Sequence, residues 1–457
     1  MAESPGVDLN IDALDGRRMT AILDAVEAGD TGLLTTLLEP LHAADIADLM
    51  EQISPPDRRS LLAMWSGEVD GEILSELDEA IRDEVIAALS PAELSEAIRE
   101  LDTDDVVDII EDMDAPQQGV ILDALEDADR FAVQQALGYP EGSAGRLMQR
   151  EVVVAPEHWT VGEAIDHLRS SDRLPEQFYH VILLDPRMKP LGYATLGRIL
   201  SSRRDTRLRD ILEEGFRTVK ATEEEEAVAY FFNQYHMISC PVVDADDRLV
   251  GVITIDDAMA VLDEEHHEDV LLLAGVGEES SIADGIRKTV RQRFPWLFVN
   301  LIAANLSALV IGQFQGTIAA LVALAALMPI VASMGGNAGT QSLTVAVRAL
   351  ATRDLTRSNA LRVVRREAAV GLINGVGFAA VMAIVGWFGY GSAMLGVVIG
   401  LAMIVNLFVA ALAGILVPLA LNRVGFDPAL ASGTFVTTMT DVMGFFVFLG
   451  LATLVLV

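Results

Sequence analysis

The stretch that decides the fold is the last 30 residues, Pro428–Val457, PALASGTFVTTMTDVMGFFVFLGLATLVLV. It is long and apolar enough to cross a bilayer as one helix, yet it contains one ionisable side chain, Asp441. A carboxylate at mid-membrane depth costs about 2.5–3.5 kcal/mol, so such residues usually face a bundle interior or a watery path. Thr437, Thr438 and Gly444 recur with Asp441 at helical spacing and predict one small polar stripe. The stretch indicates an ion or proton path, and a carboxyl group that only ties helices together is the alternative.

The charge of the chain changes abruptly near residue 287. Residues 1–286 contain 21 Lys and Arg against 63 Asp and Glu, whereas residues 287–457 contain 11 against 4. The first part predicts two soluble domains and the second a membrane domain. The sequence MAESPGVDLN at the amino terminus is acidic and lacks the apolar core of a secretory signal, so we expect the soluble part in the cytosol. The single cysteine, Cys240, agrees with a reducing compartment.

Apolar runs predict five spans within a membrane domain at residues 294–457. They cover about 295–316, 318–336, 368–388, 392–421 and 428–457. Basic residues concentrate on the cytoplasmic side of membrane proteins, and here they precede the first span or separate the second from the third: Arg287, Lys288, Arg291, Arg293, Arg348, Arg353, Arg357, Arg362, Arg365 and Arg366. We therefore expect a multi-pass protein of the cytoplasmic (inner) membrane, with its amino terminus in the cytoplasm and its carboxyl terminus outside.

Residues 1–143 predict an acidic, all-α domain built from helical repeats. HAADIADLMEQISPPDRRSLLAM at 42–64 aligns without gaps on DTDDVVDIIEDMDAPQQGVILDA at 102–124. Helix pairs that stack into a small superhelix explain such a repeat. Its acidic groups, taken alone, are typical of a solvated helix face; one of them comprises Asp102, Asp104, Asp105 and Asp108.

Residues 144–262 predict an α/β module in two similar halves, about 144–210 and 211–262. The second half reads as strand, helix, a strand at Ser239–Val243, an Asp-Asp turn, a strand at Leu249–Ile255 and a helix. The first half repeats that order. The arrangement resembles a tandem pair of CBS domains, the cystathionine-β-synthase-type regulatory module.

That resemblance implies a nucleotide site in the second half. Gly251–Asp257, GVITIDD, is similar to the pattern of the family's nucleotide cleft. By the resemblance, Thr254 and Asp257 would hold the ribose of ATP or another adenosine nucleotide. The first half departs from the pattern, since Arg198 follows Thr195 at the place of the acid. A cleft without a ligand is the alternative.

A second polar segment, Gly335–Ser342, GGNAGTQS, ends the second predicted span. Glycine and asparagine disfavour a lipid-facing helix, and backbone outside helical bonding is tolerated at membrane depth only against protein or water. We therefore expect the segment to leave helical geometry and to line a cavity with Gly335, Gly336, Asn337, Thr340 and Gln341. Close helix packing through small residues is the alternative.

Taken in order, the acidic repeat domain, the paired CBS domains, the five spans, Gly335–Ser342 and Asp441-Val442 resemble the MgtE family of magnesium channels. Asp427–Ser432 adds to the resemblance, which covers nearly the whole chain, while Thr434 stands where many members have proline. The family implies a homodimer with its pore on the two-fold axis, where Asp441 would meet its symmetry mate as the pore metal ligand. Thr437 and Thr438 would complete the pore lining.

The chemistry of such a pore suits magnesium. Two facing carboxylates repel each other until a divalent cation lies between them. Mg²⁺ keeps several of its waters, so one pair of carboxylates and a hydrogen-bonding lining fit it better than an all-protein cage. Co²⁺ and Mn²⁺ are compatible with the same site.

The acidic cytosolic part is predicted to be the sensor, because its charge opposes compaction unless cations bind. Candidate regulatory ligands gather where the second CBS half runs toward the membrane: Asp246, Asp247, Asp256, Asp257, Glu264, Glu265, Glu268 and Asp269. Residues 263–293 are expected to form one connecting helix. By the resemblance, this helix is the plug that bound Mg²⁺ holds closed. A solvated helix face is the alternative for its glutamates.

The expected partners are membrane lipid, a second copy of the chain and Mg²⁺, without nucleic acid. An enzyme is not expected, since the seven His residues show no metal-ligand spacing and no Gly-Lys-Ser/Thr phosphate loop occurs. Two alternatives stay open: a secondary carrier that exchanges Mg²⁺ for Na⁺ or H⁺, and a membrane-anchored metal or nucleotide sensor that transports nothing. One intramembrane acid without an inverted repeat disfavours the carrier, and the polar stripe of the fifth span disfavours the sensor.

Overall fold

The computed structural model describes residues 14–99, 101–111, 113, 115–171, 174–175, 178–277, 280, 285–430 and 432–457. The amino-terminal sequence used above lies outside these residues, as do Asp112 and Asp114 of the repeat and Ala431 of the 427–432 motif. The chain divides into two compact units, Met1–Asp263 and Glu264–Val457.

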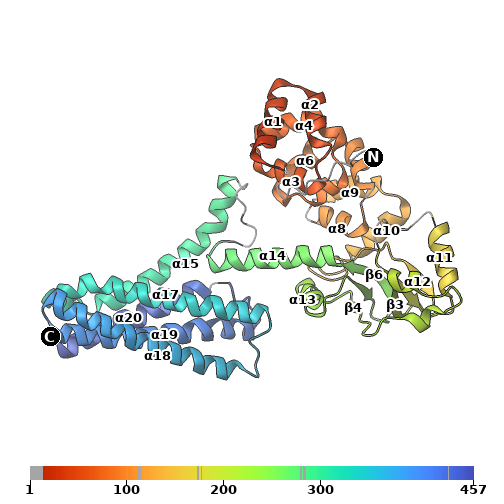
Figure 1. Cartoon of the computed structure of the whole chain (residues 1–457). Coiled ribbons are helices and arrows are strands. Elements are labelled where there is room, and N and C mark those ends of the chain that lie inside the picture. Colours follow the sequence, from red (N-terminus) through yellow and green to blue (C-terminus); the bar gives the residue numbers. More distant parts are fainter. Residues whose placement is uncertain are drawn as a thin grey trace, which may run out of the picture. The chain divides into compact units, whose positions relative to one another are not determined.

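The first unit begins with a succession of short helices, which we call the N domain (Figure 1). They are α1 (Gly16–Ala28), α2 (Thr31–Leu38), α3 (Ala43–Gln52), α4 (Pro55–Trp65), a 3₁₀ turn (Ser66–Glu68), α5 (Gly71–Ser75), α6 (Glu79–Ala88), α7 (Pro91–Arg99), α8 (Thr103–Glu111), α9 (Ala115–Ala124) and α10 (Asp127–Ala136). Asp15, Asp30 and Ser54 each cap a helix through a side-chain oxygen. Both predicted repeat copies fold as helix pairs, α3–α4 and α8–α9, which confirms the repeat.

Two small sheets follow, which we call the CBS pair. The first half contains β1 (Val154–Pro156), α11 (Val161–Ser170), β2 (His180–Leu184), β3 (Pro190–Thr195), α12 (Leu196–Ser201) and a 3₁₀ turn (Leu208–Ile211). The second contains β4 (Val219–Lys220), α13 (Glu225–Tyr235), β5 (Ser239–Val243), β6 (Leu249–Thr254) and α14 (Ile255–Leu273). In each sheet the first two strands are parallel and the last two antiparallel. The predicted similarity of the two halves is confirmed.

Cys240 lies on β5 and is fully buried. Burial raises the pKa of its thiol to about 12. A thiol that stays protonated is a poor nucleophile and a poor metal ligand, so Cys240 serves packing.

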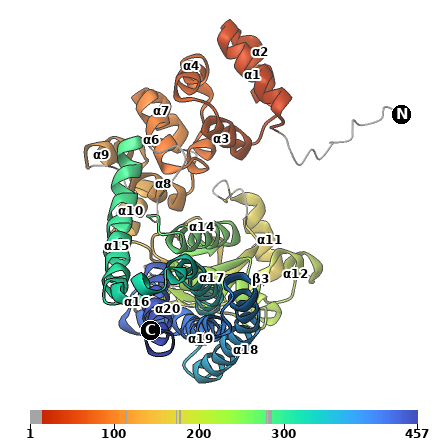
Figure 2. The ribbon, with the colours of Figure 1, turned by 90° about the vertical axis from the view of Figure 1, so that its left-hand side faces the viewer.

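The second unit is a bundle of long helices. It contains α15 (Ile286–Gly312), α16 (Gln315–Ala320), α17 (Ala323–Ala351), α18 (Ala360–Ile384) with a π-helical turn (Val385–Gly389), α19 (Ala393–Val424) and α20 (Ser432–Val455). α17, α18 and α20 all pack against α19, and Figure 2 shows these helices clustered nearly end-on. Among the described residues, four helices are long and apolar enough to cross a membrane: α15, α18 with its π turn, α19 and α20. α17 corresponds to the second predicted span, and its polar segment sets it apart from these four.

The expectation that Gly335–Ser342 leaves helical geometry is wrong, because α17 continues through the segment to Ala351. Its glycines serve close packing. A Cβ at Gly335 would clash with the Asn406 side chain of α19, and one at Gly339 would lie 2.6 Å from Val436 of α20. Asn406 is 1% exposed and donates from Nδ2 to the Val331 carbonyl at 2.8 Å. Packing through small residues, the alternative above, is what the structure contains.

The expectation of one connecting helix over 263–293 is also wrong. α14 ends at Leu273, Gly275 follows with a φ of +73°, and α15 begins at Ile286. A positive φ suits glycine and ends helices. Residues 278–279 and 281–284 of this segment lie outside the described residues.

Candidate metal centres

Asp441 lies on α20, half-buried, and makes no hydrogen bond or ion pair with another residue in the described part of the chain. The threonines beside it use their hydroxyl hydrogens within the helix. Thr437 donates to the Gly433 carbonyl at 2.9 Å and Thr438 to the Thr434 carbonyl at 2.6 Å. Since the hydrogens are used, the hydroxyl oxygens keep lone pairs for a cation or its waters. The stripe therefore offers one charged and two neutral oxygen donors.

The polar segment of α17 runs beside this stripe. A Cβ at Gly336 would lie 4.0 Å from Thr437, and Gly339 faces Val436 and Thr440. Asn337 and Thr340 are exposed on the bundle surface. Gly335 instead meets Asn406 in the core. The structure thus brings Asp441, Thr437 and Gly336 to one side of the bundle.

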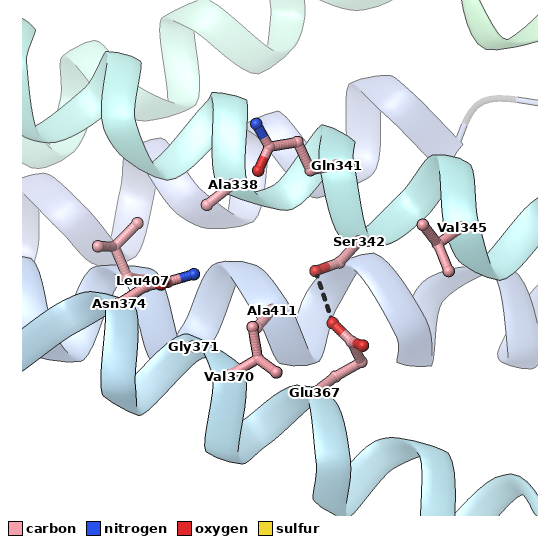
Figure 3. Close-up of a pocket in the computed structure, with 10 residues that line it drawn as sticks. All are labelled: Ala338, Gln341, Ser342, Val345, Glu367, Val370, Gly371, Asn374, Leu407 and Ala411. Atoms are coloured by element: carbon pink, nitrogen blue, oxygen red, sulfur yellow. Dashed lines mark hydrogen bonds between the residues drawn. The ribbon is translucent and has the colours of Figure 1, made fainter.

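Gln341 lies in a different place, a groove between α17, α18 and α19 (Figure 3). There Ser342 donates its hydroxyl to Oε2 of Glu367 at 3.2 Å. Sequence reasoning missed Glu367, because the third span was placed from the apolar run after it. α18 begins at Ala360, seven residues earlier. The available signal was the possibility that the helix begins among Arg362, Arg365 and Arg366, before the apolar run.

In the first unit, carboxylates from two elements face each other. Asp104 and Asp105 begin α8 of the N domain, and Asp256 and Asp257 begin α14 of the CBS pair. Burial and the negative charge of Asp257 raise the pKa of Asp104 well above its usual range. The same two causes raise the pKa of Asp105 to about 7. Facing carboxylates that cannot all ionise are a place where a divalent cation gains most.

This finding corrects the interpretation of the α8 acids as a solvated face. Asp104 is 8% exposed, so it does not lie in water. Asp108 is exposed, and it pairs with Arg82. The sequence alone could not show that Asp104 is buried and Asp108 exposed, because the difference depends on a neighbouring domain.

The predicted nucleotide residues contact each other. Thr254 donates its hydroxyl to Oδ2 of Asp257 at 2.5 Å, and its backbone N–H donates to the same oxygen at 3.2 Å. Burial raises the pKa of Asp257, although the Thr254 hydrogen bond opposes the shift. Asp104 and Asp105 add negative charge nearby, which favours a cation over a phosphate here.

The remaining predicted regulatory ligands lie elsewhere. In the turn between β5 and β6, Asp247 accepts from Lys189 Nζ at 3.0 Å and Asp246 lies 4.0 Å from Arg248. Glu264, Glu265, Glu268 and Asp269 follow along α14. Nowhere in the described ranges do three or more His, Cys, Asp or Glu side chains form a ready metal cage. A cation between α8 and α14 would therefore keep waters of its own, as Mg²⁺ does.

Comparison with known proteins identifies the chain. Family models match at residues 328–451 (MgtE, divalent cation transporter), 41–142 (MgtE intracellular N domain), and 144–205 and 208–264 (CBS domain). The magnesium transporter MgtE of Thermus thermophilus is 31% identical over 97% of this chain and 99% of that protein. The chain belongs to the MgtE family.

Other MgtE proteins are similar too. The magnesium transporter MgtE of Enterococcus faecalis is 34% identical over 70% of this chain and 71% of that protein. A crystal structure of the cytosolic domain of the Mg²⁺ channel MgtE in complex with ATP is 28% identical, covers 53% of this chain and 99% of that one, and has a TM-score of 0.49. Membership confirms the predicted order of N domain, CBS pair and helical membrane region, and MgtE proteins are multi-pass membrane transporters.

The raised pKa values of these carboxyl groups predict that the first unit is more stable at low pH than at neutral pH when Mg²⁺ is absent. Asp105 holds its proton up to about pH 7 when folded, against an ordinary value of 3.8. Its charging therefore opposes folding, and stability should fall as pH rises from about 4 to about 7. Asp105→Asn removes that proton equilibrium and should flatten the loss of melting temperature, measured by thermal unfolding in chelator. Asp123→Asn, at an exposed carboxylate of α9, is the control; an unchanged slope in Asp105→Asn would contradict the burial of this group.

Proposed function

We propose that this MgtE protein is a homodimeric Mg²⁺ channel for magnesium uptake across the cytoplasmic membrane, closed by cytosolic Mg²⁺. Its amino terminus lies in the cytoplasm and its carboxyl terminus outside. The observation that carries the proposal is a carboxylate, Asp441, that has no partner among the described residues and lies on a span whose polar stripe runs beside the polar segment of α17. The names of its relatives support magnesium as the cargo.

The pore works by neutralising charge. Asp441 has no basic side chain beside it in the described ranges, so a mobile cation has to neutralise its charge. In the proposed dimer, two copies of Asp441 face each other across the axis, and a partly hydrated Mg²⁺ between them removes their repulsion. Asn337, Thr340, Thr437 and Thr438 supply neutral oxygens for its waters. Co²⁺ and Mn²⁺ fit the same donors.

The gate works through the first unit. At low Mg²⁺ the charges of α8 and α14 repel, which loosens the N domain from the CBS pair. Bound Mg²⁺ draws the two together, and α14 carries the change toward the plug segment after Leu273. ATP or another adenosine nucleotide bound at Thr254 and Asp257 would compete with this cation, because it needs the same aspartate.

A carrier that exchanges Mg²⁺ for Na⁺ or H⁺ is the second candidate. Glu367 favours it, since a second carboxylate within the membrane helices offers the additional ion site that a carrier needs. A non-transporting sensor is disfavoured by the unpaired Asp441, which has no role in such a protein.

Asp441→Ala is predicted to abolish Mg²⁺ uptake into proteoliposomes while the protein stays folded, because the pore loses its charged ligand in both subunits. Asp441→Asn keeps the shape and should also fail to concentrate a divalent ion. Asp354→Asn, which changes an exposed acid between α17 and α18, should keep wild-type uptake. Normal uptake by Asp441→Ala would leave Asp441 as a structural carboxyl only.

Asp105→Asn combined with Asp257→Asn is predicted to leave uptake active but weakly inhibited by internal Mg²⁺, since one carboxylate from each facing side is removed. Asp246→Asn combined with Asp247→Asn is the matched control, because these acids already lie beside basic side chains. This variant should change the inhibition of uptake by internal Mg²⁺ less. Deletion of residues 1–262 should remove inhibition altogether. The measurement is uptake against internal Mg²⁺, with NaCl at equal ionic strength to separate screening from coordination. Inhibition that persists after the deletion would place the sensor in the membrane unit.

A further inference from the structure

The groove beside Glu367 has the features of an ion site. It has a volume of about 190 Å³ and lies between α17, α18 and α19. Figure 3 shows Ser342 of α17 and Glu367 of α18 pointing toward each other across it. Gln341 and Asn374 also line it. A water needs about 10–15 Å³ of such a volume, so the groove has room for a cation with most of its hydration shell.

Glu367 carries a charge that no described side chain neutralises. Ser342, which donates a hydrogen bond to it, is an uncharged residue, and no ion pair joins Glu367 to a base in the described ranges. Arg365 and Arg366 precede it directly, but successive helical residues point about 100° apart. At the start of an apolar helix, a carboxylate without a counter-charge is unfavourable. A mobile cation is the remaining way to balance it.

We propose that this groove is a second Mg²⁺ site, in which Glu367 and Ser342 hold a hydrated ion on the cytosolic side of Asp441. Carboxylate, hydroxyl and amide oxygens are ligands of hard cations, and Mg²⁺ binds through one or two carboxylates while it keeps its waters. The proposal rests on the proposed Mg²⁺ transport, but it concerns a site separate from the pore carboxylate.

The two sites lie at different levels of α17. Gly336 faces Thr437, one turn from Asp441, whereas Ser342 lies six residues later, about 9 Å along the helix. The carboxyl end of α17 precedes the arginines expected on the cytoplasmic side. Along α17, the groove therefore lies nearer than Asp441 to the end expected on the cytoplasmic side.

A thiol placed in the groove tests the site locally. Cys240 is the single cysteine of the chain and is fully buried, so Val345→Cys, at an exposed position of the groove wall, reports selectively. In full-length protein in liposomes, we expect Mg²⁺ to slow modification of this thiol by a cationic methanethiosulfonate several-fold more than NaCl of equal ionic strength. Val370→Cys is a second reporter if the first variant misfolds. Val376→Cys, exposed on α18 outside the groove, should show no such protection.

Added substitutions separate the site from the pore and the gate. Protection should vanish in Val345→Cys/Glu367→Gln and persist in Val345→Cys/Asp441→Ala, so a failed pore does not imitate a failed groove. Protection that survives Glu367→Gln would mean a gating movement and overturn the proposal. Equal protection by NaCl would overturn the proposal as well. A thiol that never reacts would show that the groove holds no water, which would also contradict a hydrated ion there.

Transport gives an independent readout. Glu367→Gln should raise the Mg²⁺ concentration for half-maximal uptake by roughly tenfold, the range seen when a group that orients a metal is lost, while maximal uptake stays within the wild-type range. Ser342→Ala should have a smaller effect in the same direction. Unchanged half-saturation in Glu367→Gln would contradict the proposal.

Discussion

Negative charge without a fixed counter-charge is the constraint on which this structure depends. The chain carries 67 acids against 32 bases, and several of the acids lie where water is scarce. Asp441 and Glu367 lie on membrane helices without a basic partner in the described ranges, and Asp104 is buried opposite Asp257. Placing basic side chains beside them would remove the repulsion permanently. In our proposal, acids without a basic partner in the described ranges let the fold and the path respond to a mobile divalent cation.

Glycine makes the membrane bundle compatible with this charge. Gly335, Gly339 and Gly414 let α17, α19 and α20 approach so closely that a Cβ at any of them would overlap a neighbour. α17 stays helical through its polar segment, and its backbone hydrogen bonds therefore stay within the helix. Asn337 and Thr340 are then held on a rigid surface. In the proposed pore, neutral oxygens at such fixed positions would bind the waters of the ion that Asp441 holds.

The order of domains and four of the five spans could be predicted from the sequence because they depend on composition and period. The repeat at 42–64 and 102–124 and the paired strand patterns of the CBS halves are local signals, and both were confirmed. The helical course of Gly335–Ser342 could not be predicted, since it depends on Asn406 and Val436, which lie far away in sequence. Asp104 and Asp247 looked alike as acids, yet Asp104 faces another carboxylate and Asp247 pairs with Lys189, which lies 58 residues earlier. Such pairings between distant segments decide pKa values and ion sites, and no local pattern reports them.

The central claim is that Mg²⁺ itself neutralises these carboxylates and flows down its own gradient. The most direct measurement is the current through wild-type protein in a planar bilayer with a Mg²⁺ gradient and no Na⁺ or pH gradient. We expect a current that reverses at the Mg²⁺ equilibrium potential and decreases when Mg²⁺ is raised on the side of the N domain. A flux that requires a Na⁺ or pH gradient, or that carries no current, would contradict the account and favour a carrier.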